Sequence, residues 1–174
     1  MRAKRELCYT LRMDEKDLLN LSAKELTDLG VCPTCLNRKY PGAIFGDDAD
    51  KRLYRDEDVE ILFVAKPRAV GHLCILSVPH YHDMSEAPDA LNEKIVRYAK
   101  FLMKTLCEVC GCERVYLCTM CDGPANHYHV QLIPRYAGEE RGSLNFVKPR
   151  GEYRHDPRVV AAIRTKLEAF SKGQ

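Results

Sequence analysis

The chain has 174 residues, which gives room for one domain with a sizeable core. Hydrophobic residues make up 45% and charged residues 30%, a balance that is typical of a folded protein and argues against a largely disordered chain. The 27 basic and 25 acidic residues nearly cancel, which argues against nucleic acid as the main partner. No run approaches the roughly 18 apolar residues of a membrane helix, so we expect no membrane partner.

The nine cysteines are the unusual feature of the composition. A secreted disulfide scaffold begins with a signal peptide, whereas residues 1–6 are rich in charge and no apolar stretch follows them. We therefore expect a cytoplasmic protein whose cysteines are reduced thiols that serve as core residues, as metal ligands or as both.

Helical signals occupy residues 13–30. Ser22 and Glu25 have the spacing of a capping box and Gly30 suits a helix end, so this segment is predicted to form a helical hairpin or a broken helix. Cys32-Pro-Thr-Cys35 follows at once. Its two cysteines have the spacing of zinc ligands, although a single pair of this kind is ambiguous.

Short runs rich in β-branched and aromatic residues then predict strands at residues 43–45, 59–65, 72–78, 114–120 and 127–133. The first three lie too close together for crossover helices, which favours an antiparallel sheet. Apolar residues at helical spacing predict one long helix from Pro88 to Gly111. Residues 134–156 are expected to form a loop and 157–172 a terminal helix. The predicted fold class is α+β: a mainly antiparallel sheet packed by one long helix, with added N- and C-terminal helices.

The segment 127–133 carries the main chemical signal. Alternate side chains of a strand share a face, so His127, His129 and Gln131 are predicted to point to one side and the apolar residues between them to the other. Neutral imidazole is a competent nucleophile near pH 7 and can attack phosphorus to form a covalent intermediate. An amide beside it can donate a hydrogen bond to a phosphoryl oxygen without titrating. The three residues are therefore candidates for catalysis at phosphorus.

These residues resemble the motif of the histidine triad (HIT) superfamily, His-φ-His-φ-His-φ-φ, with Gln131 in place of the third histidine. The His-x-His-x-Gln form is that of the branch that includes galactose-1-phosphate uridylyltransferase and diadenosine tetraphosphate phosphorylase. Residues 66–72, 79–82 and 132–135 are similar to further segments of the family. The order of strands, long helix and histidine strand agrees with the elements predicted above.

The resemblance implies a domain organisation and an activity. A single domain, 1–174, would contain a HIT-like core at about residues 32–136, an N-terminal helical extension at 1–31 and a C-terminal loop and helix at 137–174. The implied substrate is a small nucleotide, such as a diadenosine polyphosphate, or a nucleotide sugar, and the implied reaction is hydrolysis, nucleotidyl transfer or phosphorolysis. Family members are commonly homodimers, so a homodimer is one expectation.

By the same resemblance, His129 is the nucleophile that takes up a nucleotidyl group, with His127 beside it, and Gln131 binds the phosphate. At the position where many members carry Asp or Asn to hold the ribose hydroxyls, this chain has Val64. The implied nucleoside recognition therefore differs from that of those members.

Further phosphate-binding positions are expected around the strand. The loop before it offers Gly123 and Asn126, because turns with free N–H groups receive phosphate oxygens. Basic residues in or after the strand are further candidates for contacts with a substrate phosphate: Arg135 first, then Lys148, Arg150 and Arg154.

The resemblance also implies a structural zinc ion. Zinc in the His-x-His-x-Gln branch is held by such a cysteine pair, by a histidine of the Pro-x-x-His turn and by the first histidine of the motif. Carried over, the ligands are Cys32, Cys35, His82 and His127, with His80 as the competitor of His82 in the same turn. Four protein ligands fill a tetrahedral shell, so the metal would fix His127 and take no part in the chemistry.

Other cysteines and other functions stay open at this stage. A second set with similar spacing forms either core or a second metal site: Cys107, Cys110, Cys118 and Cys121. The alternatives to an enzyme are a non-catalytic, zinc-stabilised nucleotide-binding or regulatory protein with the same fold, and a zinc-stabilised interaction module without affinity for phosphate esters.

Overall fold

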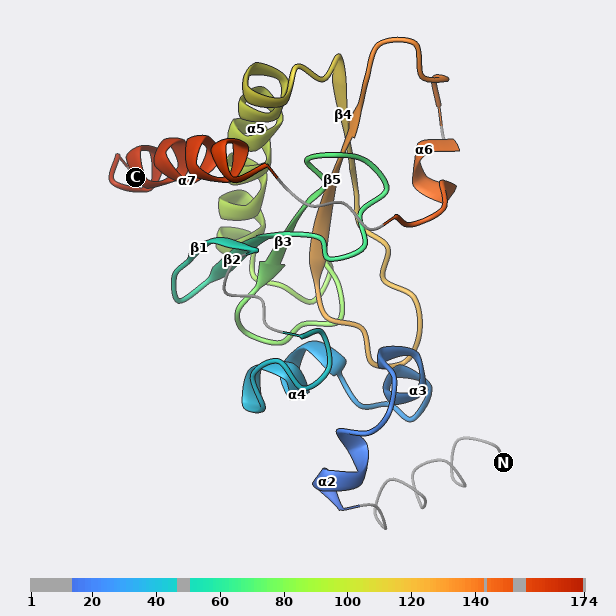
Figure 1. Ribbon diagram of the computed structural model, residues 1–174. Coiled ribbons are helices and arrows are strands. Elements are labelled where there is room, and N and C mark those ends of the chain that lie inside the picture. Colours follow the sequence, from blue (N-terminus) through green and yellow to red (C-terminus); the bar gives the residue numbers. More distant parts are fainter. Residues whose placement is uncertain (1–13, 47–50, 143, 152–155, 174) are drawn as a thin grey trace.

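The computed structural model describes residues 14–46, 51–142, 144–151 and 156–173. At its centre is a five-stranded antiparallel sheet with the strand order β1-β2-β3-β5-β4. The strands are β1 (Arg52–Arg55), β2 (Val59–Phe63), β3 (Leu73–Ser77), β4 (Arg114–Cys118) and β5 (His129–Arg135). One long helix and further helices near both ends accompany the sheet, which confirms the predicted α+β class (Figure 1).

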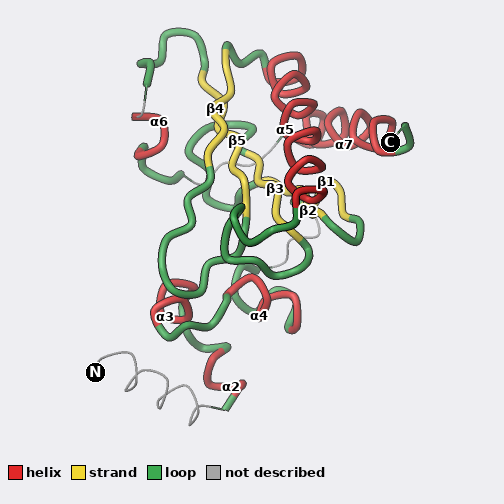
Figure 2. The backbone as a smooth tube through the Cα atoms, turned by 180° about the vertical axis from the view of Figure 1, so that it is seen from behind, coloured by secondary structure: helices red, strands yellow, loops and turns green. Residues whose placement is uncertain are grey.

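Helix α5 (Asp89–Cys110) and helix α7 (Pro157–Ser171) lie together on one side of the sheet, as Figures 1 and 2 show from opposite directions. The main core lies beneath α5, where alternate strand residues such as Ile61, Ile75 and Val130 are almost fully buried. Helix α5 ends as predicted because Gly111 adopts a left-handed conformation with a φ of 69°. Pro88 is the residue before its first turn.

Three short helices form the N-terminal part: α2 (Glu15–Leu18), α3 (Ala23–Asp28) and α4 (Pro33–Lys39). The predicted capping box is present, since Ser22 accepts from the backbone N–H of Glu25 and the Glu25 carboxylate accepts from that of Ser22. A second, smaller core joins the three helices through Leu18, Leu26 and Leu36. Helix α4 approaches the sheet from the side opposite to α5.

The prediction of a strand at residues 43–45 is wrong, because these residues form a turn after α4. The side-chain oxygen of Asn37 accepts hydrogen bonds from the backbone N–H groups of Ile44 and Phe45 at 3.0 and 3.2 Å. This amide takes the place of the acceptors that a neighbouring strand would supply, so the segment curls beneath α4.

The first strand of the sheet is β1, which the pattern did not predict. It has four residues, and Leu53 alone among them is buried, so it shows almost no apolar alternation. Helix α4 and helix α6 (Leu144–Val147) also occupy segments that were expected to be irregular. The segment Asp47-Asp-Ala-Asp-Lys51, whose composition predicts a turn, lies mostly outside the described residues. Of the helices in the described part of the chain, none is both long and apolar enough to cross a bilayer.

Candidate functional site

A cavity of about 910 Å³ lies on the face of the sheet opposite α5. Cavity-facing residues of β2, β3 and β5 line it, together with residues of α4, the turn at 41–45, and the side chains of Lys66 and Arg150. This volume is within the range of sites for small ligands. His129 and Gln131 both line the cavity, so the structure brings together the two residues on which the proposed chemistry depends.

The alternation of β5 places these residues as the pattern predicted. Val130 and Leu132 are 2% and 0% exposed and belong to the core under α5. His129 and Gln131 point to the opposite face, and Gln131 pairs across the strands with Cys74 of β3. Strand β5 lies between β3 and β4, so both side chains are presented by an inner strand of the sheet.

A chain of hydrogen bonds fixes the orientation of both rings and of the amide. The backbone N–H of Arg68 donates to His72 Nδ1 at 3.1 Å, and His72 Nε2 lies 3.0 Å from Gln131 Oε1. Gln131 Nε2 lies 3.2 Å from His129 Nε2, and His129 Nδ1 lies 2.8 Å from the carbonyl oxygen of His127. The backbone N–H at one end of the chain can only donate, and the carbonyl oxygen at the other end can only accept. The direction of each hydrogen bond between them is therefore fixed.

That chain leaves a lone pair on His129 Nε2. Because His72 Nδ1 accepts, His72 Nε2 donates to the Gln131 oxygen, and the Gln131 amide nitrogen then donates to His129 Nε2. The proton of His129 therefore resides on Nδ1, where the carbonyl of His127 accepts it. Burial lowers the pKa of His129; the hydrogen bond to the His127 carbonyl offsets part of this change, and the charge of Arg150 adds to the lowering. The ring is thus a neutral imidazole near neutral pH.

Four potential metal ligands form a cluster at the start of α4. Among the described residues, Cys32, Cys35, His80 and His127 are the one such group, and their ligand atoms all lie within 4.8 Å of one another. Cys32 Sγ lies 3.4 Å and Cys35 Sγ 3.5 Å from His127 Nδ1. His80 Nδ1 lies 3.3 Å from both Cys35 Sγ and His127 Nδ1.

These separations fit a tetrahedral zinc ion. Zinc–sulfur and zinc–nitrogen bonds of about 2.3 and 2.05 Å place tetrahedral S···N pairs about 3.6 Å and N···N pairs about 3.4 Å apart. His127 also has the matching tautomer, because its Nε2 lies 2.8 Å from the Ser77 carbonyl, which can only accept a proton. The lone pair on His127 Nδ1 is therefore directed at the two sulfurs. Two thiols and two imidazoles form the donor set that zinc prefers.

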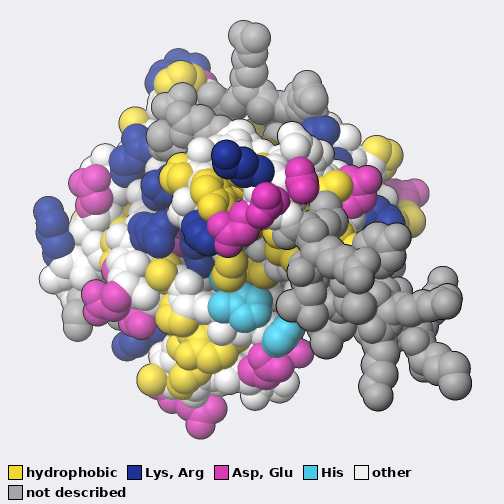
Figure 3. Space-filling model, turned by 90° about the horizontal axis from the view of Figure 1, so that it is seen from below, with side chains coloured by type: hydrophobic (Ala, Val, Ile, Leu, Met, Phe, Trp, Pro, Cys, Tyr) yellow, Lys and Arg dark blue, Asp and Glu magenta, His cyan; other side chains and the backbone are white. Residues whose placement is uncertain are grey.

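The assignment of His82 as a metal ligand needs correction, since the structure places His80 in the cluster instead. Hydrogen bonds of His82 run to Glu86, from its backbone N–H at 3.0 Å and from its Nδ1 at 2.9 Å. These bonds turn the ring away from the cysteines. Figure 3 shows histidine side chains at the molecular surface, with acidic side chains close by.

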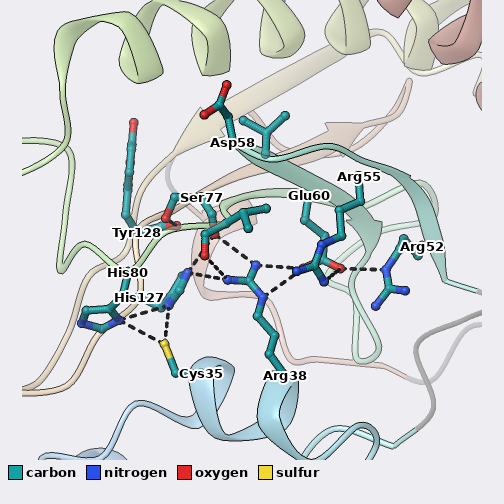
Figure 4. A network of polar contacts seen from close by, with 12 residues as sticks. Cys35, Arg38, Arg52, Arg55, Asp58, Glu60, Ser77, His80, His127 and Tyr128 are labelled. Atoms are coloured by element: carbon teal, nitrogen blue, oxygen red, sulfur yellow. Dashed lines mark hydrogen bonds and ion pairs between the residues drawn. The ribbon is translucent and has the colours of Figure 1, made fainter.

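Arg38 connects the metal cluster to the sheet (Figure 4). It donates to the carbonyl oxygens of Ser77 and Val78 at 3.0 and 2.7 Å and to the carboxylate of Glu60 at 2.8 Å. Its Nη1 also lies 3.2 Å from His127 Nε2, but because that nitrogen carries the proton donated to Ser77, this is a close approach of two donors and not a hydrogen bond. Burial alone would raise the pKa of Glu60, but the hydrogen bond and charge of Arg38 and the neighbouring charge of Arg55 hold that pKa below its usual value.

Arg135 lies away from the nucleophile, which corrects its expected role at the phosphate. It is six residues further along β5, about 20 Å from His129 at the rise of a strand. Its guanidinium is 2.9 Å from the carboxylate of Glu113 and donates to the Glu139 carbonyl at 3.3 Å. The side chain therefore stabilises the far end of the sheet.

The loop positions do not line the cavity. A Cβ on Gly123 would lie 2.8 Å from the methyl group of Thr27, so the loop packs closely on α3. The amide of Asn126 donates to the carbonyl of His82. Lys148 pairs with a glutamate at 2.6 Å, whereas Arg150 lines the cavity. Arg154 lies outside the described residues.

The second set of cysteines does not come together. Cys107 Sγ is 3.6 Å from Cys112 Sγ at the end of α5, whereas Cys118 lies opposite Gln131 on β4. Among the described residues, neither Cys118 nor Cys121 belongs to a group with metal-site geometry. Packing is therefore the better account of these residues.

Two important residues, Arg38 and Glu60, were not predicted. Arg38 is three positions after Cys35, so recognition of α4 would have placed both on one helix face. Glu60 is a charged residue in the otherwise apolar strand β2, and such a residue requires a buried partner.

No model of a protein family matches the sequence, and no curated protein matches it at a significant level. Solved structures do match. A hypothetical histidine triad nucleotide-binding protein from Sulfolobus tokodaii is 19% identical with a TM-score of 0.58, over 80% of this chain and 92% of that one. A zinc-bound histidine triad family protein from Mycobacterium smegmatis is 16% identical with a TM-score of 0.53, over 71% and 87%.

A third match is a diadenosine triphosphate hydrolase from Plasmodium falciparum, solved with cyclomarin A. It is 10% identical with a TM-score of 0.53, over 74% of this chain and 82% of that one. At such identities, the likeness concerns the backbone. Together with the antiparallel sheet, the long helix and the position of the histidine strand, these matches show that the chain has the fold of the histidine triad proteins.

Proposed function

We propose that the protein is a nucleotide hydrolase or nucleotidyltransferase that acts through a nucleotidyl group bound covalently to His129. The hydrogen-bond chain from Arg68 to His129 carries the proposal, because it supplies a neutral ring with a lone pair on Nε2 at a cavity.

The reaction has two displacements at phosphorus. His129 Nε2 gives up the hydrogen bond from Gln131 and attacks the phosphate next to the nucleoside; the N–P bond forms, and the P–O bond to the leaving group breaks with its electron pair on that oxygen. The ring becomes positively charged, and the His127 carbonyl stabilises the proton on Nδ1. An acceptor oxygen from water, inorganic phosphate or another phosphate ester then forms the new P–O bond, and the N–P electron pair returns to Nε2.

Two groups are suited to the phosphate oxygens. Gln131 has a second amide N–H besides the one directed at His129, and it can donate without a change in charge. Arg150 lines the cavity, and its charge acts on His129, so it can balance the charge on the phosphate. Its guanidinium is held by a bond of 3.0 Å to the carbonyl of Lys66.

The test of the reaction is mass spectrometry of the protein after rapid mixing with diadenosine polyphosphates and with nucleotide sugars. We expect an adduct with the mass of a nucleoside monophosphate on His129, and its mass identifies the base. His129→Asn should bind the same compounds without an adduct. Tight binding without an adduct or turnover in the wild-type protein contradicts the proposal and favours the non-catalytic nucleotide-binding alternative.

We propose that the cluster of Cys32, Cys35, His80 and His127 holds a structural zinc ion. The four donors complete its shell, and through His127 the ion fixes the backbone that accepts the proton of His129. Metal analysis should give one zinc per chain, lost in Cys35→Ser and kept in Cys118→Ser. Zinc retained in Cys35→Ser contradicts this site.

A further inference from the structure

Three arginines, here called the arginine wall, surround one carboxylate beside the cavity (Figure 4). Arg38 Nη2 lies 2.8 Å from Glu60 Oε2, Arg52 Nε lies 2.7 Å from Oε1, and Arg55 Nη1 lies 3.5 Å from Oε1. Glu60 is 4% exposed, so its carboxylate is part of the folded structure. All four residues line the cavity.

Strand register places the arginine wall across the cavity from the nucleophile. Glu60 of β2 pairs with Leu76 of β3, and Leu76 pairs with His129 of β5. The three residues therefore form one row on the cavity face. Two strand spacings of about 4.8 Å separate Glu60 from His129 by about 10 Å.

Among the described residues, the arginine wall carries more positive charge than the one carboxylate that pairs with it can neutralise. One carboxylate cannot neutralise three guanidinium groups, and one arginine would be enough to pair it. The side chains of Arg52 and Arg55 are 42% and 38% exposed, against 17% for Arg38. Within the described residues, the side chains of Arg52 and Arg55 pair with Glu60 alone, which leaves N–H donors directed at solvent or ligand. Like charges held together in a concave site attract an anion.

Apolar side chains line the part of the cavity between the arginine wall and His129. Leu62 and Leu76 line the cavity from the sheet, and Ile44 and Phe45 line it from the turn after α4. Asn37 holds that turn through the hydrogen bonds described above. A flat ring fits between such surfaces better than a chain of phosphates does.

We propose that the substrate carries two separated anionic groups: a phosphate that His129 attacks and a second phosphate or carboxylate that the arginine wall binds. A nucleobase or sugar ring lies between them against Leu62 and Leu76. This inference rests on the proposed function and narrows its substrate class. A simple nucleoside diphosphate does not meet the requirement, because its charges are adjacent.

Calorimetric binding at fixed ionic strength tests this with matched pairs of nucleotides. AMP is compared with adenosine 3′,5′-bisphosphate and with N6-succinyl-AMP, and UMP with orotidine 5′-monophosphate, so the arms separate phosphate from carboxylate. The protein is used as wild type, as Arg52→Gln/Arg55→Gln and as Arg158→Gln. Arg158 is a matched control because its side chain is 91% exposed on α7.

In the wild type, at least one compound with a second anion should bind about 10- to 100-fold more tightly than its parent, the gain from charge-assisted hydrogen bonds. The double variant should lose that gain and keep the affinity for AMP and UMP, whereas Arg158→Gln should keep both. If the double variant unfolds, Arg55→Gln alone serves, because its contact with Glu60 is the longest of the three.

Two results overturn the inference alone. Equal binding of parents and second-anion compounds to the wild type shows that the arginine charge is compensated within the chain, and the proposed function then survives by itself. A gain that persists in the double variant places the second anion elsewhere. Failure of every nucleotide to bind or to label His129 refutes the proposed function as well.

Discussion

The two faces of the sheet are built from the same strands but differ completely in character. Under α5, Ile61, Ile75 and Val130 are buried among apolar side chains. On the cavity face, their sequence neighbours Glu60 and His129 carry the charge and the nucleophile. Because successive strand residues point to opposite faces, stability and chemistry are assigned to alternate positions of one backbone.

The difference between the two faces of the sheet explains how a small protein can hold reactive groups in place. Strands β2, β3 and β5 are anchored on one face by a continuous core, so the residues of the other face need not pack well to stay in position. A cavity can therefore occupy that face at little cost to the fold. Substitutions on the two faces should have separable effects.

The largest effect on stability is expected at Ile75. Ile75 is 0% exposed, so Ile75→Ala should reduce the free energy of unfolding by about 2–5 kcal/mol. Leu76→Ala, its neighbour on the cavity face, should cost less than about 1.5 kcal/mol because Leu76 already borders open space, yet it should weaken nucleotide binding. Chemical denaturation and calorimetric binding measure the two effects. Equal losses of stability would show that the faces are not functionally divided.

The next effect is expected at Glu60, the charged exception in β2. Glu60→Gln should reduce the free energy of unfolding by about 1–3 kcal/mol, because the arginine wall then repels itself without a counter-charge. The groups that face Glu60 are Arg38 from α4 and Arg52 and Arg55 from β1. Arg38→Gln is a matched partner, and the pair of variants in a double-mutant cycle isolates the coupling.

This effect should depend on pH with a defined sign. The folded pKa of Glu60 lies below its usual value of 4.5, so its contribution is complete above that pH and is lost as the pH falls through the folded value. The difference in unfolding free energy between wild type and Glu60→Gln should therefore be largest near pH 6 and shrink below pH 4.5. A difference that grows towards acid pH contradicts the ion-pair assignment.

The fold class and the histidine strand were predictable because both follow from the spacing of apolar and polar residues within short segments of the sequence. Alternation at His129 and Gln131 and the helical spacing up to Gly111 need no knowledge of distant residues. The choice between His80 and His82 was different, since both flank one residue of a turn. It is decided by side-chain contacts: His82 bonds Glu86, whereas His80 lies against Cys35 and His127, which are remote from it in sequence.

The same reasoning explains what the sequence could not show about the cavity. Its arginine wall joins α4 to β1, two elements whose local patterns are weak, and the turn at residues 41–45 is held by the side chain of Asn37. The prediction that Arg135 binds the phosphate was wrong for the opposite reason. It matched a motif beside the nucleophile in sequence, but a strand carries neighbours in sequence steadily apart in space.

The smallest predicted effect tests whether the cavity face can be disturbed without the core. His72 is buried between Arg68 and Gln131. Its Nδ1 accepts from the backbone N–H of Arg68, so its Nε2 donates to the Gln131 amide, which in turn donates to His129. His72→Phe should slow adduct formation on His129 about 10-fold, or about 1.4 kcal/mol, because the Gln131 amide then loses its fixed orientation.

A second variant of His72 that recovers the rate of adduct formation distinguishes a positioning role of this residue from a packing role. His72→Gln restores a donor to Gln131 Oε1, because its amide nitrogen reaches the position of His72 Nε2, so it should recover most of the rate while packing less well than His72→Phe. Single-turnover mass spectrometry gives the rates, and thermal unfolding gives the stabilities. If rate instead followed stability across the two variants, His72 would act as a core residue, and the hydrogen-bond chain would not be what sets the tautomer of His129.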